Sequence, residues 1–581
     1  MITEEIKKVI GEALKALGVD NSEVSLEHPK DLAHGDYSTN VALQYAKELK
    51  MKPKELAEKI LKGLSLKSKD SPWIGSPWMG TWMGKAEVAG AGFINFYLSK
   101  EFFAEQVKEI LEKKDDFGRN EHCAGMRALV EYTQPNPFKE FHIGHLMSNA
   151  IGEAIARITA FHGAEVKRAC YQGDVGLHVA KAVYGYQKLG GKTITDWGKA
   201  YAYGSEMYES YEDIKKEINE LNTKIFEQSD NTVNKIYQDG KKVSLEHFEG
   251  IYKTLGTKFD YYFFESETGV LGKKLVEENL GRIFEKSEGA VVFPESKSGL
   301  HTRVFLNSQG LPTYEAKELG LAKIKYEKYP YDFSVVITGN EINEYFKVLL
   351  KAMEFVFPDL AKKTKHLSHG MLRLPTGKMS SRKGGVITGE WLIERVKKMV
   401  LEKVKEREFS DIEKEKVAEV VAVGSIKYSI LRQQVGGDIV FDFDKSISFE
   451  GDSGPYLQYS YARACSVLRK GTSSVPTLCR DTSLKGGTVK APPLKGGGGD
   501  VLPRFLYRFP EIVERAGKEY APHYIATYLI EIAGAFNGWY AKERILDAGD
   551  ETAYRLALTR AFAQVMKNGL WLLGIATPEK M

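Results

Sequence analysis

The most constraining feature of this chain is a predicted strand that runs into a proline-rich loop and then into a helix opened by two histidines. The strand is Ala128–Tyr132, and His142–His145 (His-Ile-Gly-His) precedes apolar residues at helical spacing. Further strands are predicted near Val166–Cys170 and at Ser334–Thr338. This alternation is typical of a doubly wound parallel sheet, in which ligands bind where strands end and helices begin.

The start of the helix at His142 is suited to binding phosphate. Backbone N–H groups at a helix start attract anions, and an imidazole can donate a hydrogen bond to a phosphate oxygen. We therefore predict that His142 and His145 stabilise charge on a leaving pyrophosphate, and that Gly144 leaves space for the adenine or ribose of ATP. The alternative interpretation is a helix end with two incidental polar side chains.

A basic loop later in the chain strengthens the first interpretation. Residues 378–384 read Lys-Met-Ser-Ser-Arg-Lys-Gly, between flanks that contain glycine and proline. Such a loop can close over a nucleotide and bring the cations that adenylyl transfer needs. Alone it reads as a solvated basic segment; together with His142–His145 it predicts activation of a carboxylate by ATP. The loop residues expected to act are Lys378, Met379, Ser380 and Arg382.

The length of 581 residues is too great for a single core and implies about three or four domains, and the pattern along the chain indicates three. These are a small α+β domain at 1–115, a sheet-containing domain at 116–410 with a helical insertion near 180–290, and a helical domain at 411–581. The first domain should contain a helix over 1–19, a helix from about Thr39 to Leu64, a tryptophan-rich loop at 73–82 and a strand over Glu87–Leu98. Residues 471–500 are rich in Ser, Pro, Gly and Lys and read as a flexible surface insertion.

Composition excludes several other classes of protein. The four cysteines are widely scattered without zinc-ligand spacing, so we expect no metal site and a reducing, cytoplasmic compartment. No signal peptide and no run of 18 apolar residues are visible, which predicts no membrane segment. The net charge of +4 is compatible with a nucleic-acid partner without indicating one.

With both motifs in place, the chain resembles the class I aminoacyl-tRNA synthetases, and specifically the arginyl-tRNA synthetase family. The similar segments lie along most of the chain. They are His28-Pro29 with Leu32–Tyr37, Gln134–Lys139, Gly173–Gly176 (Gly-Asp-Val-Gly), Phe449–Tyr459 and the ending Gly574–Met581. Gln134, Val175 and Glu318 stand where the family commonly has Ser, Trp and Asp.

The resemblance implies a multidomain α/β protein. A Rossmann-like catalytic domain would lie between a tRNA-contacting α+β domain and an all-α anticodon-binding helical bundle. The implied reaction is ligation of L-arginine to tRNA(Arg) through an arginyl-adenylate, with ATP and Mg²⁺, by a monomer. Whether amino-acid activation itself requires bound tRNA stays open. Lys139 joins the catalytic candidates, and the division of roles between Lys139 and Lys378 stays open as well.

The resemblance also implies an arginine pocket built from Glu131, Asn136, Tyr314 and Glu318. A guanidinium is always charged and offers five donors, so carboxylates are its natural partners. Tyr314 and Glu318 are four residues apart, which places them on one helix face. Asn136 would hold the amino or carboxylate end of the substrate. Without the resemblance, Tyr314 and Glu318 read as an ordinary helix face with a solvated acid.

The C-terminal helices carry aromatic and basic residues that could stack on anticodon bases and contact phosphates. Most of these aromatics can equally be core residues of a helical bundle. The set is Tyr459, Tyr461, Arg463, Phe536, Trp539, Tyr540, Lys542 and Arg544. Two other functions stay open at this point: a class I synthetase for another amino acid such as cysteine, and a non-catalytic RNA-binding paralogue.

Overall fold

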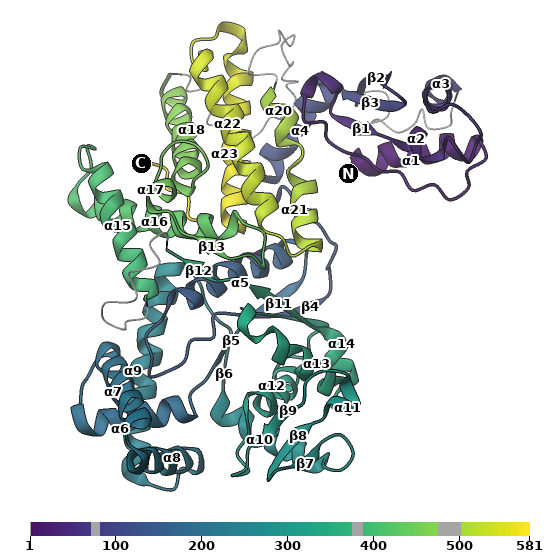
Figure 1. Cartoon of the computed structure of the whole chain (residues 1–581). Helices are drawn as coiled ribbons and strands as arrows, with labels where there is room; N and C mark the ends of the chain where they lie inside the picture. Colours follow the sequence, from purple (N-terminus) through teal and green to yellow (C-terminus); the bar gives the residue numbers. More distant parts are fainter. Residues whose placement is uncertain (1, 71–81, 375–386, 475–500) are drawn as a thin grey trace.

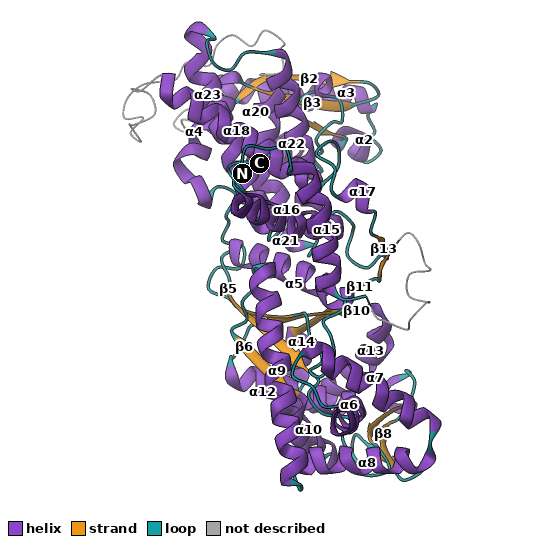
Figure 2. Cartoon of the chain, turned by 90° about the vertical axis from the view of Figure 1, so that its left-hand side faces the viewer, coloured by secondary structure: helices purple, strands orange, loops and turns teal. Residues whose placement is uncertain are grey.

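The computed structural model describes residues 2–70, 82–374, 387–474 and 501–581. Helices dominate the molecule, and the strands gather in its middle, in the N-terminal arm and around β8 in its lower part (Figure 2). The arm projects to one side at the top of Figure 1, the C-terminal helices form the upper body, and two lobes flank the lower half. Residues 378–382 and most of the 471–500 segment lie outside the described residues.

The central sheet has five parallel strands in the order β11-β10-β4-β5-β6. The strand order reverses direction at β4, which is the place where a doubly wound sheet opens a ligand crevice. The three strands predicted from the sequence are therefore confirmed. The bounds are β4 (Arg127–Glu131), β5 (Glu165–Gln172), β6 (Tyr261–Phe264), β10 (Phe333–Gly339) and β11 (Thr364–His369).

Four helices separate β5 from β6 and form one of the two lower lobes (Figure 1). They are α6 (Leu177–Leu189), α7 (Ile194–Ser210), α8 (Glu212–Glu227) and α9 (Asn231–Leu255). Their apolar faces pack together around the buried Trp197. The helical insertion ends earlier than the predicted boundary near 290, because β6 pairs with β5 and belongs to the central sheet.

The other lower lobe packs helices against a small antiparallel sheet of β7, β8 and β9. α12 begins at Tyr314 and packs closely on α10, where Gly272 and Gly320 allow the two backbones to approach. The bounds are α10 (Glu265–Glu278), β7 (Glu285–Ser287), β8 (Ala290–Phe293), α11 (Glu295–Ser298), β9 (Arg303–Leu306), α12 (Tyr314–Lys328), α13 (Asn343–Val356) and α14 (Pro358–Lys363).

The helix α5 (Ile143–Phe161) is buried on nearly every face, because the sheet covers one side and C-terminal helices cover the other. The C-terminal part is helical as predicted, apart from the short strand β13 (Ile439–Val440), which pairs with β12 (Leu372–Arg373). Its helices are α15 (Gly389–Val404), α16 (Asp411–Leu431), α17 (Phe443–Ser446), α18 (Gly454–Ser474), α20 (Val501–Leu506), α21 (Phe509–Lys518), α22 (His523–Lys542) and α23 (Thr552–Leu572). The sheet-containing and helical parts thus share one core.

The N-terminal arm corrects two sequence-based predictions. The single helix expected over 39–64 is two helices, because Pro53 lacks an N–H and starts a new one. The single strand expected over 87–98 is a hairpin that turns at Gly90 and Gly92, both with positive φ. The arm contains α1 (Ile2–Ala16), β1 (Tyr37–Thr39), α2 (Val41–Tyr45), α3 (Pro53–Asp70), β2 (Met83–Ala89), β3 (Phe93–Leu98) and, leading to the body, α4 (Lys100–Lys113).

Residues of the His28–Tyr37 segment dock the arm on the body. Arg504 Nε lies 2.7 Å from Asp36 Oδ1, and His28 Nε2 lies 3.0 Å from Glu511 Oε2. Tyr507, from the C-terminal part, completes the arm's own apolar core. Of the tryptophan-rich loop, Trp82 is described and is buried in that core.

Among the described residues, no helix is long and apolar enough to cross a membrane. The same residues contain no cluster of three or more His, Cys, Asp or Glu side chains that could hold a metal ion.

Candidate active site

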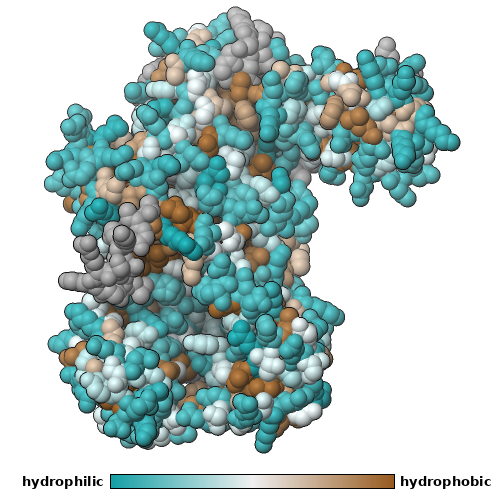
Figure 3. Space-filling model, viewed as in Figure 1, coloured by the Kyte–Doolittle hydropathy of each residue, from teal (hydrophilic) through white to brown (hydrophobic). Residues whose placement is uncertain are grey.

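A cleft of about 950 Å³ opens at the carboxyl ends of all five parallel strands. Its lining includes residues that directly end or follow each strand: Gln134 after β4, Gly173 after β5, Glu265 after β6, Gly339 at the end of β10 and His369 at the end of β11. The space-filling view shows a recess between the two lower lobes, whose outer surfaces are mostly hydrophilic (Figure 3). The predicted ligand crevice of a doubly wound fold is therefore present.

The two histidines line this cleft at the start of α5, here called its histidine end. His142 caps α5, with its Nδ1 accepting from the Gly144 N–H at 3.1 Å, and His145 Nδ1 accepts from the His142 N–H at 3.2 Å. The rings stack with centroids 3.5 Å apart. Because each Nδ1 is an acceptor, the proton of each neutral ring lies on Nε2.

Electrostatics keep both imidazoles neutral. Burial lowers the pKa of His142, and the nearby Lys139 lowers it further. Burial, followed by the charge of His142, holds the pKa of His145 well below its usual range. The pair therefore offers two Nε2–H donors at neutral pH.

The basic loop lies outside the described residues, but both of its flanks reach this end of the cleft. The Ile143 N–H donates to Ile387 O at 3.1 Å, and the Gly389 N–H donates to Phe141 O at 2.7 Å. Leu372 and Ile387, on opposite sides of the loop, both line the cleft. The chain on either side of Lys378, Met379, Ser380 and Arg382 thus starts and ends beside the histidines.

Three of the predicted arginine contacts lie together in the cleft: Asn136, Tyr314 and Glu318. Asn136 sits against Gly173, where a Cβ would come within 2.5 Å of Asn136 Oδ1, so Gly173 makes room for it. Glu318 accepts a hydrogen bond from Tyr345 Oη at 3.2 Å. Burial, and then the charge of Glu131, raise the pKa of Glu318 to about 8.

Glu131 has a different environment from the one predicted. Its carboxylate pairs with Lys325 Nζ at 2.6 Å and accepts from Gln134 Nε2 at 2.8 Å. The side chain is fully buried and is not part of the cleft lining that the described residues form. Glu131 thus contacts Lys325 and Gln134 and acts on Glu318 through its charge, and its contact with arginine stays a prediction.

Sequence reasoning missed another buried acid of the cleft. Glu265 directly follows the aromatic strand β6, and Glu131 is the last residue of β4. Both acids therefore lie where a strand of the central sheet ends. Glu265 pairs with Lys317 Nζ at 2.5 Å, and burial raises its pKa. The sequence signal for Glu265 is the aromatic run Tyr261–Phe264 directly before it, which is a strand of the central sheet.

Lys139 and Asp174 connect the cleft to the helical insertion. The ammonium of Lys139 lies 4.4 Å from the centre of the Tyr201 ring on α7. Asp174 is fully buried and accepts hydrogen bonds from Tyr237 Oη and Lys241 Nζ, both at 2.7 Å. The Gly-Asp-Val-Gly segment therefore fixes α9 to the end of β5, which explains its acid without a catalytic role.

The chain matches known families along its whole length. The Arginyl tRNA synthetase N terminal domain matches residues 4–98, the catalytic domain of tRNA synthetases class I (R) matches residues 106–443, and the DALR anticodon binding domain matches residues 457–581. The chain belongs to the arginyl-tRNA synthetase family. The family resemblance, the three-part fold and the class I catalytic domain predicted from the sequence are thereby confirmed.

Individual relatives match this chain over nearly the whole length of both proteins. The arginine–tRNA ligase of Treponema denticola is 31% identical and covers 100% of both chains. That of Archaeoglobus fulgidus is 31% identical over 99% of this chain and 100% of its own. The solved Thermus thermophilus arginyl-tRNA synthetase has 25% identity and a TM-score of 0.77 over 100% of both chains.

In this synthetase, the residues expected to meet RNA divide into three groups. Tyr461, Phe536 and Trp539 are buried among the helices, as the core interpretation predicted. Tyr459, Arg463, Tyr540 and Arg544 instead line a second cavity of about 720 Å³. Lys542 is exposed at the end of α22.

This second cavity, here called the base pocket, has aromatic walls joined by a cation. The Arg463 guanidinium lies 4.7 Å from the Tyr459 ring centre and 5.0 Å from that of Tyr540. The last residues of the chain, Glu579–Met581, also line the pocket. Flat rings beside fixed guanidinium groups suit an unstacked base and its phosphate.

Proposed function

We propose that this chain ligates L-arginine to tRNA(Arg) through an arginyl-adenylate, with the two ends of the cleft binding opposite charges. The observation that carries the proposal is the joint position of the neutral histidine pair and of Glu318 in one cleft at the sheet's carboxyl edge. Phosphate would meet donors at one end while a guanidinium meets carboxylates at the other. The substrate carboxylate would then lie between them, facing ATP.

In the first step, a carboxylate oxygen of arginine attacks the α-phosphorus of ATP, and the bond to the bridging oxygen of pyrophosphate breaks. The Nε2–H groups of His142 and His145 would donate to the phosphates as negative charge grows on the leaving group. Lys378, Ser380 and Arg382 would close over the same oxygens from the loop, with Met379 against the adenine. Gly144 leaves the α5 start open to the nucleotide.

Mg²⁺ would enter with ATP, held by phosphate oxygens and water, and would neutralise phosphate charge. Lys139 is close enough to both histidines to lower their pKa, so its charge would also be felt by a bound phosphate. No covalent bond to the protein is needed, because positioning and charge stabilisation suffice for this chemistry.

Arginine would be selected by Glu318 and Tyr314, with Asn136 holding its amino or carboxylate end. A guanidinium that replaces the proton of Glu318 forms a charge-assisted pair in a partly buried site, which is stronger than an exposed one. A site built on such bonds can reject analogues that lack them by roughly 10⁴–10⁵. This would remove the need for proofreading.

In the second step, a hydroxyl of the terminal tRNA ribose attacks the adenylate carbonyl carbon, and AMP leaves. The base pocket would hold an anticodon base at the other end of the molecule. We also propose a cytoplasmic monomer, for which sedimentation should give a mass near 65.2 kDa.

The deciding experiment is aminoacylation of total tRNA by the purified chain with each of the twenty amino acids, ATP and Mg²⁺. Label from arginine alone is expected. Label from another amino acid would keep the catalytic chemistry but remove Glu318 and Tyr314 as specificity residues. No label, with tRNA still bound, would indicate a non-catalytic RNA-binding paralogue.

A further inference from the structure

The loop between β4 and α5 has a strained backbone at three positions. Thr133, Gln134 and Phe138 have φ values of 80°, 50° and 68°, and they are three of the nine non-glycine residues with positive φ in the described part of the chain. A residue with a Cβ disfavours this left-handed region by roughly 5–30-fold in population. Such conformations persist only where their surroundings hold them, and they gather at functional sites. The contacts that hold this loop therefore bear on the cleft that it lines.

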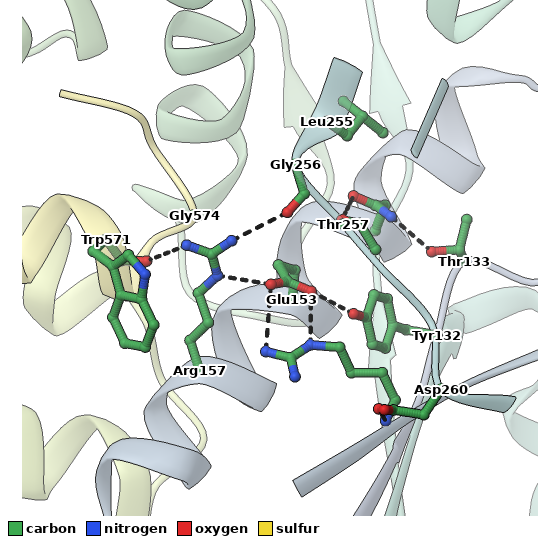
Figure 4. Close-up of polar contacts among 12 residues, drawn as sticks. Tyr132, Thr133, Glu153, Arg157, Leu255, Gly256, Thr257, Asp260, Trp571 and Gly574 are labelled. Carbon is green, nitrogen blue, oxygen red and sulfur yellow. Dashed lines mark hydrogen bonds and ion pairs between the residues drawn. The ribbon is translucent and has the colours of Figure 1, made fainter. Parts of the chain in front are cut away.

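Helix α5 holds the first strained residue, Thr133, by two hydrogen bonds. The Thr133 N–H donates to Ser148 Oγ at 3.0 Å, and Asn149 Nδ2 donates to Thr133 Oγ1 at 3.0 Å. The Asn149 side chain is fully buried, and its Oδ1 accepts from Thr257 Oγ1 at 3.1 Å. Figure 4 shows Thr133 and Thr257 on opposite sides of this amide. Because Thr257 occupies the amide oxygen, the amide nitrogen is directed at Thr133.

Tyr132, the residue before the strained segment, fixes where the strand ends. Its ring is fully buried and lies over Gly152, where a Cβ would come within 2.2 Å of Tyr132 Cγ. Its Oη donates to Glu153, which also accepts from Arg157 at 2.7 Å and from Arg168 at 3.1 Å. Figure 4 shows the Glu153 carboxylate between Tyr132 and Arg157. The strand end cannot shift to relieve the strain, because it is packed and hydrogen-bonded on α5.

The helical insertion holds the other end of the loop through Phe138. The Phe138 N–H donates to Ser244 Oγ of α9 at 2.9 Å. The Phe138 ring is fully buried, with its centre 5.2 Å from the Trp197 ring centre and 5.8 Å from that of Tyr237. A Cβ at position 240 would come within 2.5 Å of Phe138 Cε1, so Gly240 makes room for the ring. With both ends fixed, the segment between them can adopt few conformations.

The segment between these two fixed ends presents two amide side chains to the cleft, Gln134 and Asn136. Gln134 Nε2 donates to Glu131 Oε1 at 2.8 Å, and Asn136 lies against Gly173. If Thr133 took an ordinary right-handed conformation, its φ would change by about 140°, and the chain after it would leave this wall of the cleft. A misplacement of about 1 Å can cost roughly 10²-fold in rate. The strained backbone at Thr133 is therefore what places the two amides.

We propose that Asn149 is a positioning residue for arginine activation. It holds Thr133 in the left-handed conformation and so places Gln134 and Asn136 against the amino and carboxylate end of arginine. The proposal rests on the proposed function, because it takes the cleft as the arginine site. Asn149 itself is buried behind the cleft wall and is not part of the cleft lining that the described residues form. It acts through the geometry of the loop and not through contact with the substrate.

The test compares three substitutions of Thr133 that separate its hydroxyl from its Cβ. Thr133→Ser keeps both groups, Thr133→Ala keeps the Cβ alone, and Thr133→Gly removes both, but glycine adopts positive φ without the Cβ penalty. The quantity measured is kcat/KM for arginine in ATP–pyrophosphate exchange with saturating tRNA. We expect a wild-type value for Thr133→Ser, a loss of roughly 5–30-fold for Thr133→Ala and a loss of less than about threefold for Thr133→Gly. A role in packing or hydrogen bonding alone predicts that glycine is at least as harmful as alanine.

Asn149→Ala completes a double-mutant cycle with Thr133→Gly. In the wild-type background it should lower kcat/KM for arginine by roughly 5–30-fold, and in the Thr133→Gly background by less than about twofold, because glycine has no hydroxyl to bond and no strain to hold. The KM for ATP should change less than about twofold in either background, since the bonds of the histidine end are local to 142–145. Thr159→Ala should keep both wild-type values and is the control, because Thr159 is buried on the same helix about 15 Å further along.

Two results would overturn the proposal: a Thr133→Gly value equal to or below that of Thr133→Ala, and an equal loss from Asn149→Ala in both backgrounds. A loss in Thr133→Ser as large as in Thr133→Ala would assign the effect to the threonine methyl group and have the same meaning. Thermal unfolding identifies a variant that does not fold, and if Asn149→Ala is that variant, the three substitutions of Thr133 decide alone. No exchange with arginine by the wild type would instead refute the proposed function.

Discussion

Burial sets the protonation state of the side chains at both ends of the catalytic cleft, although one end would bind an anion and the other a cation. At one end, burial keeps His142 and His145 neutral, and local backbone bonds fix where their protons lie. At the other end, burial and neighbouring acids raise the pKa of Glu318, which favours its neutral form when no cation is bound. The first end is assembled from four consecutive residues, whereas the second is assembled from distant helices and strands. A site built from consecutive residues can therefore be predicted from a sequence motif, whereas a site built from distant segments can be recognised only once the fold is known.

The largest effect is expected at the local end. His145→Ala should cut arginine-dependent ATP–pyrophosphate exchange, measured with saturating tRNA, by roughly 10²–10³, the range for loss of one preorganised donor. Binding of tRNA should change little, because the base pocket is remote. His122→Ala is the control, since His122 is exposed. Unchanged exchange in His145→Ala would remove this residue from the catalytic step.

At the distributed end, Glu318→Gln should raise the KM for arginine by roughly 10–150-fold, which corresponds to ~1.5–3 kcal/mol for a hydrogen bond to a charged group. The effect on kcat should be smaller. Glu327→Gln on the exposed side of the same helix α12 serves as the control. Equal KM values in the wild type and Glu318→Gln would mean that the guanidinium lies elsewhere in the cleft.

The pH dependence of arginine binding separates the two ends. Glu318, with its pKa raised to about 8, must release its proton when a guanidinium binds. As the pH falls below about 8, the KM for arginine should therefore rise by up to about tenfold per pH unit, and above that pH it should be flat. Steady-state kinetics of Glu318→Gln should lack this slope. A wild-type KM independent of pH between 6 and about 8 would show that Glu318 is already ionised in the empty cleft.

The smallest effect on arginine is expected for Glu131→Gln, because Glu131 faces Lys325 and not the cleft. Removing one partner of this buried pair should destabilise the fold by about 3–5 kcal/mol, and the thermal unfolding midpoint should fall clearly. The KM for arginine should change less than about fivefold, since only the charge near Glu318 is altered. A large rise in KM without a loss of stability would restore Glu131 as a direct contact.

The sequence predicted the parts of the molecule that depend on short-range patterns. The strands at β4, β5 and β10, the α5 start and the identity of the family followed from apolar runs and from motifs of a few residues. The pairing of Glu131 with Lys325 could not be foreseen, because 194 positions separate the two and only the packing of α12 on the sheet joins them. Glu265 was missed for the same reason: its strand follows a long helical insertion and pairs with β5 across it.

In the N-terminal arm, the missed features were turns. Pro53 and the Gly90–Gly92 turn are visible in the sequence, and a stricter use of them would have divided both elements correctly. The two groups of aromatic residues in α18 and α22 could not be separated in this way. Helical spacing gives the faces of a helix, but it does not tell which face meets a neighbouring helix and which meets a cavity.

The position of Tyr507 in the core of the N-terminal arm has a consequence for how the protein is made. The last strand of the arm, β3, ends at Leu98, so about 400 more residues must be synthesised before Tyr507 emerges, and at ~5–20 residues per second this takes roughly 20–80 s. During that time the site that Tyr507 fills beside Phe102 and Phe103 stays open on the nascent chain. The arm is made before the body, but its core can therefore be completed only after Tyr507, late in the chain, has been synthesised.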